Sequence, residues 1–131
     1  MEDSIFTRII KGEIPCHKIY EDEHTIAFLT IQPFAPGHTL VVPKRQVDQI
    51  WDLEDDEYAN LMRVVKRLGL HIRDTLGKQR VGIVVKGFEV PHVHVHLIPA
   101  SRGEHVNFDP MNLQTADEGV LAELAEKLRL Q

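Results

Sequence analysis

The strongest constraint on this chain is a stretch of seven residues, HVHVHLI, at positions 92–98. Successive side chains of a β-strand point to opposite faces of a sheet. The alternation therefore predicts a strand that turns its histidines to one face and Val93, Val95 and Leu97 to the other. We expect the apolar face to pack into the core and the histidine face to carry the chemistry.

A row of histidines first suggests a metal site. Side chains two residues apart on a straight strand are separated by roughly 6.5 to 7 Å, which would place His92 and His96 about 13 Å apart. Zinc nitrogens lie only about 2.0–2.1 Å from the ion. Two adjacent histidines could share one ion but three could not, and no cysteine pair is close in sequence. A metal-binding histidine protein therefore remains only an alternative.

An anionic, extended ligand such as a phosphate chain suits the histidine row better. A neutral imidazole offers a nucleophilic nitrogen, and its protonated form donates two hydrogen bonds, with an unperturbed pKa of about 6.5. Phosphoryl or nucleotidyl transfer through a covalent phosphohistidine is therefore the leading hypothesis. His94 is the best-placed nucleophile because it is the central histidine, with an imidazole on either side.

The pattern His-φ-His-φ-His-φ-φ, in which φ is apolar, is the signature of the histidine triad (HIT) family. The chain also resembles this family at residues 4–15, 20–23 and 36–44. The resemblance implies an α+β fold, namely a HIT-like antiparallel five-stranded meander sheet with one main helix and a C-terminal helix. It implies one domain over residues 1–131, with a HIT core at 1–100 and a C-terminal extension at 101–131.

The same resemblance implies cleavage of a nucleotide at its α-phosphate, in a nucleoside phosphoramidate or a dinucleoside polyphosphate, through a nucleotidyl-His94 intermediate. His96 would contact the non-bridging oxygens, His92 would hold the neighbouring ring in its tautomer, and His38 would orient the site. No cofactor is required, although a divalent cation could accompany a polyphosphate. The alternative is a nucleotide-binding regulatory module without efficient turnover.

The resemblance also supplies residues for binding a purine nucleotide. Thr30 stands where relatives usually carry an acidic residue for the ribose, and Phe88 and Glu89 replace a Gln and a Ser or Thr near the phosphates. Glu89 is expected either to point away or to act as a proton donor with a raised pKa, while Lys86 could supply positive charge. The positions that would enclose the base are Ile5, Phe6, Ile9, Phe28, Ile31 and Leu40.

Periodicity and turn residues predict the other elements. The segments with strand or helix patterns are a short helix capped by Asp3 or Ser4 and stopped by Gly12, a hairpin over 17–22 and 25–30, strands at 38–43 and 80–86, and helices within 52–77 and 117–130. In the long helix, Asp52 and Asp55 resemble a capping box and Gly77 a C-terminal cap. The apolar stripes are Tyr58, Leu61, Met62, Val65, Leu68, Ile72 and Leu76 in the first helix and Val120, Leu121, Leu124 and Leu128 in the second.

Composition limits the class of protein. A chain of 131 residues with 43% hydrophobic and 27% charged residues is typical of one globular domain. Its net charge of −5 disfavours a general nucleic-acid partner. The start, MEDSIF, lacks the basic residues of a signal peptide, and no apolar run is long enough to cross a membrane. We therefore expect a cytoplasmic protein and, from the resemblance, a homodimer.

Overall fold

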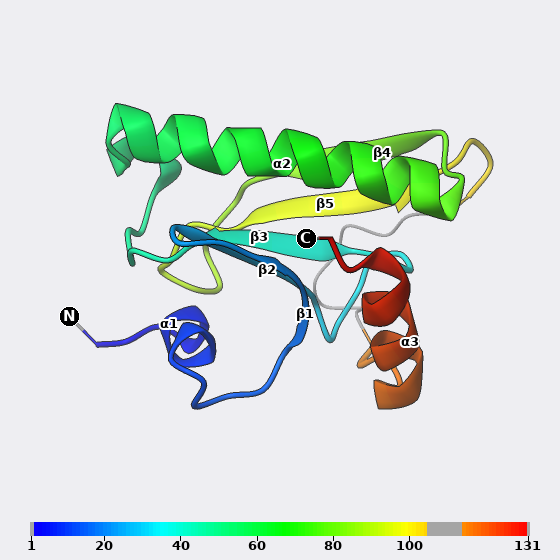
Figure 1. Ribbon diagram of the computed structural model, residues 1–131, viewed down its shortest axis with the longest axis horizontal. Coiled ribbons are helices and arrows are strands. Elements are labelled where there is room, and N and C mark those ends of the chain that lie inside the picture. The colour runs from blue at the N-terminus through cyan, green and yellow to red at the C-terminus, as the bar shows by residue number, and fades with distance from the viewer. Residues whose placement is uncertain (1, 105–113, 131) are drawn as a thin grey trace.

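A five-stranded antiparallel sheet forms the centre of this computed structural model, which describes residues 2–104 and 114–130. Helices lie on both sides of the sheet (Figure 1). The elements are α1 (Ile5–Ile10), β1 (His17–Glu21), β2 (Thr25–Leu29), β3 (Thr39–Pro43), the 3₁₀ turn η1 (Ile50–Asp52), α2 (Asp55–Leu76), β4 (Arg80–Val84), β5 (Val95–Ala100) and α3 (Glu118–Leu128). The predicted extension at 101–131 is thus described only in part.

The strand order is β1-β2-β3-β5-β4. The first three strands form a meander, and α2 then carries the chain to β4 at the edge, so that β5 returns between β3 and β4. The predicted α+β class, with an antiparallel five-stranded sheet, one main helix and a C-terminal helix, is confirmed. The order of the last two strands is the only departure from a simple meander.

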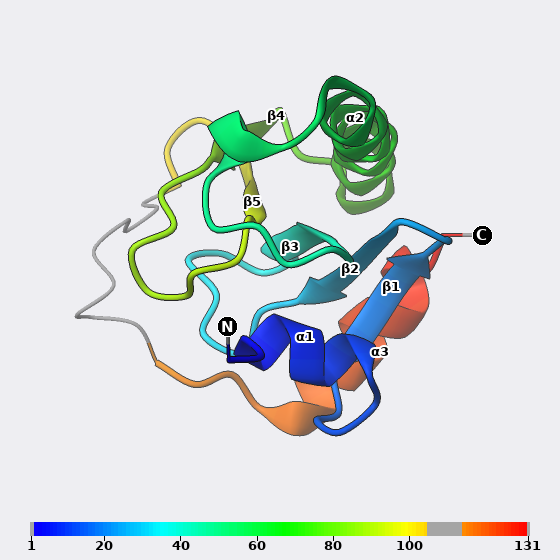
Figure 2. The ribbon, with the colours of Figure 1, turned by 90° about the vertical axis from the view of Figure 1, so that its left-hand side faces the viewer.

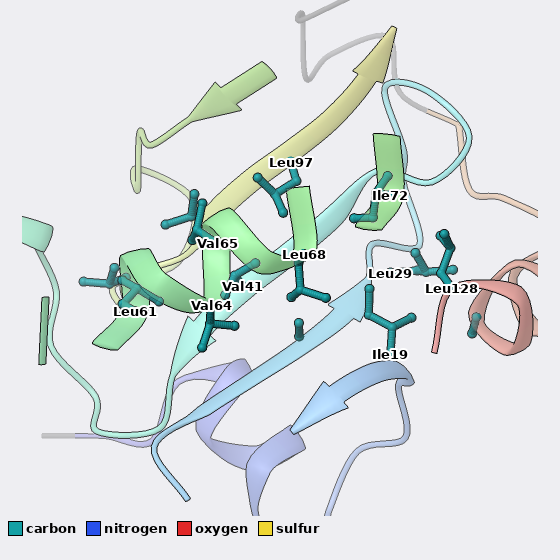
Figure 3. Packing of buried hydrophobic residues seen from close by; sticks show 14 of the residues in the cluster. Ile19, Leu29, Val41, Leu61, Val64, Val65, Leu68, Ile72, Leu97 and Leu128 are labelled. Carbon is teal, nitrogen blue, oxygen red and sulfur yellow. The ribbon is translucent and has the colours of Figure 1, made fainter. Parts of the chain in front are cut away.

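The main core lies between α2 and one face of the sheet. The stripe predicted on this helix is buried at Leu61, Val65, Leu68 and Ile72. Figure 3 shows these side chains directed toward strand residues such as Val41. Tyr58, predicted in the same stripe, is 42% exposed because it lies in the first turn of α2, near the end of the helix.

The N-terminus of α2 differs from the prediction. A capping box at Asp52 and Asp55 is wrong, because residues 50–52 form the separate turn η1 and the helix begins at Asp55. The N-cap is Glu54, whose backbone N–H donates to the Glu57 carboxylate at 2.9 Å. At the other end, Gly77 has a φ of 63° and provides the predicted left-handed C-cap.

The two shorter helices lie below the sheet in the view of Figure 2, with α2 above it, and α3 reaches α2 where Nε2 of His71 lies 3.0 Å from the carbonyl oxygen of Leu128. Ser4 is the N-cap of α1, which places Phe6 against the face of the sheet opposite α2. The helix α3 packs on β1 through Leu121, Ala125 and Leu128, while Val120, predicted to be on the packed side, is 51% exposed. The buried residues of α3, Leu121, Ala125 and Leu128, follow one another at spacings of four and three positions, and Val120 lies beside this stripe. Within residues 2–104 and 114–130, no helix is long and apolar enough to cross a membrane.

Candidate active site

The histidine segment is less regular than one strand. Val93, Val95 and Leu97 do pack in the α2 core, as the alternation predicts. The strand, however, begins only at Val95, so the prediction of a straight strand from residue 92 is wrong. The N–H of His92 donates to the Val90 carbonyl in a turn, and the N–H of Val93 donates to the Val47 carbonyl, so that these two residues do not join the ladder.

In His94, the ring nitrogen Nδ1 is hydrogen-bonded, and Nε2 has no hydrogen-bond partner among the described residues. Its side chain is buried, with 4% exposed, and Nδ1 lies 2.7 Å from the carbonyl oxygen of His92. A carbonyl only accepts hydrogen bonds, so Nδ1 carries the proton and donates it. In the neutral ring, Nε2 then keeps its lone pair, which is the form that a nucleophile needs.

His92 is fixed at both ring nitrogens. Its Nε2–H donates to the Pro43 carbonyl at 2.7 Å, and the hydroxyl of Ser4 donates to its Nδ1 at 2.6 Å. Burial lowers the pKa of His92, which favours the neutral ring that this pattern requires. The expectation that the ring of His92 holds the His94 ring in its tautomer is wrong. The backbone carbonyl of His92 makes that contact instead.

His38 and His96 are joined by a hydrogen bond whose donor and acceptor can be assigned. The backbone N–H of Phe34 donates to Nδ1 of His38 at 2.9 Å, so the proton of the neutral His38 is on Nε2, 2.9 Å from Nδ1 of His96. His96 therefore accepts at Nδ1 and carries its own proton on Nε2. Burial lowers the pKa of His38 to about 3, with a further contribution from His96. It lowers that of His96 to about 4, with a further contribution from His94.

The cap of α1 is part of the site. The oxygen of Ser4 accepts from the Thr7 N–H at 3.0 Å while its hydroxyl donates to His92. The side-chain carbonyl of Gln46 accepts from the Ser4 N–H at 2.8 Å and from the Thr7 hydroxyl at 2.7 Å. The start of α1 is thus tied directly to the histidine segment.

The predicted base-binding residues divide into two groups. Phe6, Phe28 and Leu40 are buried together on the sheet face of His96, because Phe28, Leu40 and His96 are paired in register on β2, β3 and β5. The Phe6 ring lies 5.0 Å from the ring of His94. Ile9 is half-buried at the margin of this cluster. The remaining two, Ile5 and Ile31, are 48% and 53% exposed and lie outside it.

The structure also shows the contacts of Thr30 and Glu89, which depart from the HIT pattern. The Thr30 hydroxyl accepts from the Gln32 N–H at 3.3 Å. Glu89 is exposed and forms an ion pair with Lys86 at 3.3 Å. The expectation of a raised pKa at Glu89 is wrong, because a hydrogen bond from its own backbone N–H and the ammonium of Lys86 lower it.

Sequence reasoning missed several partners of the histidines. It identified Ser4 only as a helix cap, and its hydrogen bond to His92 spans 88 positions in sequence. The amide of Phe34 and the carbonyl of Pro43 are backbone groups, so no residue type could reveal them. In the part of the chain that the structure describes, no three His, Cys, Asp or Glu residues are grouped to hold a metal ion.

A five-stranded antiparallel sheet that presents three histidines around the start of an inner strand, here β5, defines the class of histidine triad proteins. In agreement, the family model for the HIT domain matches residues 11–103. The chain belongs to the HIT family.

Relatives in three organisms support this assignment. An uncharacterized HIT-like protein of Methanocaldococcus jannaschii is 43% identical over 92% of this chain and 97% of its own length. The adenosine 5'-monophosphoramidase of Saccharomyces cerevisiae is 41% identical over 72% of this chain and 61% of its own. The crystal structure of a Hit-like protein involved in cell-cycle regulation from Bartonella henselae superposes with a TM-score of 0.86 at 29% identity, over 97% and 94% of the two chains.

Proposed function

We propose that this protein is a nucleotidyl hydrolase or transferase that cleaves a nucleotide at its α-phosphate through a nucleotidyl-His94 intermediate. One observation carries the proposal: the bond from Nδ1–H of His94 to the His92 carbonyl leaves Nε2 as a free lone pair in a buried site. The ring of His96 lies 5.0 Å from that of His94, close enough for both to meet one phosphate group.

The proposed reaction has two steps. Nε2 of His94 forms a bond to phosphorus while the bond from phosphorus to the leaving group breaks, and a leaving amine takes a proton from solvent. The Nε2–H of His96 donates to a non-bridging oxygen as negative charge spreads over the phosphate. Water then attacks phosphorus, the bond to His94 breaks, and the nucleoside monophosphate departs. The scheme needs no cofactor, although a divalent cation could accompany a polyphosphate substrate.

Two yeast relatives favour a nucleoside phosphoramidate as the substrate. The proteins from Saccharomyces cerevisiae and Schizosaccharomyces pombe carry the name adenosine 5'-monophosphoramidase. The base would pack on the apolar cluster of Phe6, Phe28 and Leu40, and apolar contacts select weakly among purines. A cytoplasmic location accords with a nucleotide substrate.

We also propose a homodimer through the edge strand β4 and the adjoining surface of α2. Among the strands of residues 2–104 and 114–130, β4 pairs with β5 alone and leaves its other edge open, which natural sheets usually cover. Beside it, Ile83 of β4 and Leu70 of α2 are 55% and 50% exposed and flank a groove of about 360 Å³. A second copy, related by two-fold symmetry, would pair the two edges and bury both groups of apolar side chains.

The activity is tested by measuring the release of AMP from adenosine 5'-phosphoramidate and from diadenosine polyphosphates. We expect turnover by the wild type and a loss of at least about 1,000-fold in His94→Ala, because among the four histidines of the site His94 is the one with a free lone pair. Circular dichroism and thermal unfolding establish that the variant is folded. Full activity in folded His94→Ala would remove the proposed nucleophile.

The second candidate is a nucleotide-binding module without turnover. The observation in its favour is the pair of departures from the HIT pattern at Thr30 and Glu89, which by that resemblance would remove a carboxylate from the ribose and bring one to the phosphates. Calorimetry with AMP separates the two: nucleotide binding with no hydrolysis of any of these substrates would favour the module.

A further inference from the structure

A cavity of about 490 Å³ opens beside His94 on the side facing α2. Val93 and His94 line it, together with Met62 of α2 and Val85, which follows β4. Its volume lies within the range of about 300–1,000 Å³ that is usual for small-molecule sites. The buried Phe6 also contacts the ring of His94, at 5.0 Å. His94 is thus in contact with the apolar base cluster and also borders a second, separate space.

Aromatic side chains surround this cavity and are largely unpacked. Trp51 of η1 is 83% exposed, Phe88 of the loop before the triad is 92% exposed, and Tyr58 of α2 is 42% exposed, although all three line the cavity. Large aromatics left this open are unusual on a monomer surface and commonly mark a binding site. A planar or long apolar group between them would bury surface that the free protein leaves in water.

The charge of the cavity is balanced. Among its lining residues, Lys86 is the basic side chain and Asp48 the acidic one. Lys86 is further engaged with Glu89 at 3.3 Å. A polyphosphate chain carries several negative charges and needs matching cations, which these residues do not supply. A neutral apolar group would meet no such cost.

From these observations we infer that the cavity is the leaving-group site, and that it accepts an aromatic or long apolar amine joined to the α-phosphate by a P–N bond. The inference rests on the proposed function. With the base on its own cluster near Phe6, the cavity on the other side of His94 is the space available to the group that departs from phosphorus. Of the two substrate classes considered, it selects the phosphoramidate and disfavours the second nucleotide of a dinucleoside polyphosphate.

The test compares kcat/KM for three substrates: unsubstituted adenosine 5'-phosphoramidate, its N-(2-phenylethyl) derivative and diadenosine triphosphate. This parameter reports the step in which the leaving group departs. We expect the phenylethyl derivative to exceed the unsubstituted compound by about 10-fold and diadenosine triphosphate to be the poorest, since a gain of about 1.4 kcal/mol from burying an aromatic group between rings corresponds to that factor.

Variants of Trp51 and Phe88 test whether these side chains cause the preference for the phenylethyl derivative. Trp51→Ala and Phe88→Ala should each lower the ratio of kcat/KM for the phenylethyl derivative over the unsubstituted compound by about 3- to 10-fold. Val120→Ala, an exposed apolar residue on α3, should keep the wild-type ratio. Sedimentation of each variant is measured alongside.

The outcomes are distinct. Equal rates for the first two substrates, or an unchanged ratio in both aromatic variants, would overturn the leaving-group site. Loss of dimer mass in those variants, with the ratio unchanged, would instead assign the aromatics to contact with a second copy and overturn it as well. Failure of the wild type to turn over any of the three substrates would contradict the proposed function itself.

Discussion

Each histidine at the centre of this molecule has its tautomer set by a hydrogen bond with a backbone group or with a neighbouring histidine. The Pro43 carbonyl holds His92, the His92 carbonyl holds His94, and the Phe34 amide reaches His96 through His38. Imidazoles with fixed protons need no rearrangement before reaction, which is the physical basis of preorganised catalysis. The proposed roles of these side chains therefore depend on groups that do not touch the substrate.

Ser4 offers a direct test of that dependence. Ser4→Ala removes the donor to Nδ1 of His92 and the cap of α1, so we expect kcat to fall by about 10- to 100-fold. The free energy of unfolding should fall by about 1 kcal/mol. Ser4→Thr keeps both functions and should restore most of kcat.

Long-range ¹H–¹⁵N correlation spectra of the rings supply a readout independent of activity. In the wild type, His92 should show its proton on Nε2 and His94 on Nδ1. In Ser4→Ala we expect His92 to show a mixture of tautomers. A single unchanged tautomer together with unchanged kcat would contradict the positioning role of Ser4.

The buried histidines also predict how stability depends on pH. The pKa of His38 falls from 6.5 to about 3 on folding, so between these values the unfolded chain binds a proton that the folded one does not. Stability is therefore complete above pH 6.5 and falls as the pH drops, by up to about 1.4 kcal/mol per pH unit for such a group.

Urea unfolding of the wild type and of His38→Gln at pH 7 and pH 5 measures this effect. His38→Gln should lose less stability than the wild type over that interval, because glutamine does not titrate. An identical loss in the two proteins would show that His38 does not stay neutral on folding.

At the residue scale, the types of side chain at the site could be predicted from the sequence, but their hydrogen-bond partners could not. The spacing of the triad and the match at His38 identified four histidines that the structure does bring together with Phe6, Phe28 and Leu40. The carbonyl of Pro43 and the amide of Phe34 could not be predicted, because every residue carries such groups. Only the fold brings these two to the rings.

At the scale of elements, α2 and its caps determine where the core lies. The periodic stripe predicted this helix because burial at Leu61, Leu68 and Ile72 follows the helical repeat. The N-terminal boundary was misplaced because Asp52 is of a type favoured at N-caps and Glu54 is not, whereas residues 50–52 form the separate turn η1. The strand boundary at Val95 was missed for a similar reason, since a turn before a strand can carry the same alternation.

Gly69 inside α2 and Gly77 at its C-cap form a matched pair for testing this helix. Gly77 has a φ of 63°, so Gly77→Ala should lower the free energy of unfolding by about 1 kcal/mol. Gly69 lies inside the helix, and an added Cβ would have no heavy atom within 4 Å beyond its chain neighbours and the backbone of its own helix, so Gly69→Ala should raise the free energy of unfolding by about 0.5–1 kcal/mol. Opposite signs in urea titrations are expected, and equal signs would refute this account of the C-cap.

For the molecule as a whole, the open edge of β4 leads to the proposed homodimer. Ile83→Asp places a charge on the exposed apolar side chain at that edge and should yield a monomer, because two buried carboxylates would face each other across the two-fold axis. Val120→Asp makes the same change on α3, where the side chain is also about half exposed, and should remain dimeric. Sedimentation velocity measures both masses, and a dimeric Ile83→Asp would rule out this interface.

The central claim is that His94 forms a bond to phosphorus, and intact-protein mass spectrometry after millisecond mixing with adenosine 5'-phosphoramidate tests it most directly. We predict a transient mass increase of one adenylyl group, located at His94 by peptide mapping under non-acidic conditions and absent in His94→Ala. An adduct on another residue, or steady release of AMP with no adduct at any mixing time and an active His94→Ala, would contradict the claim.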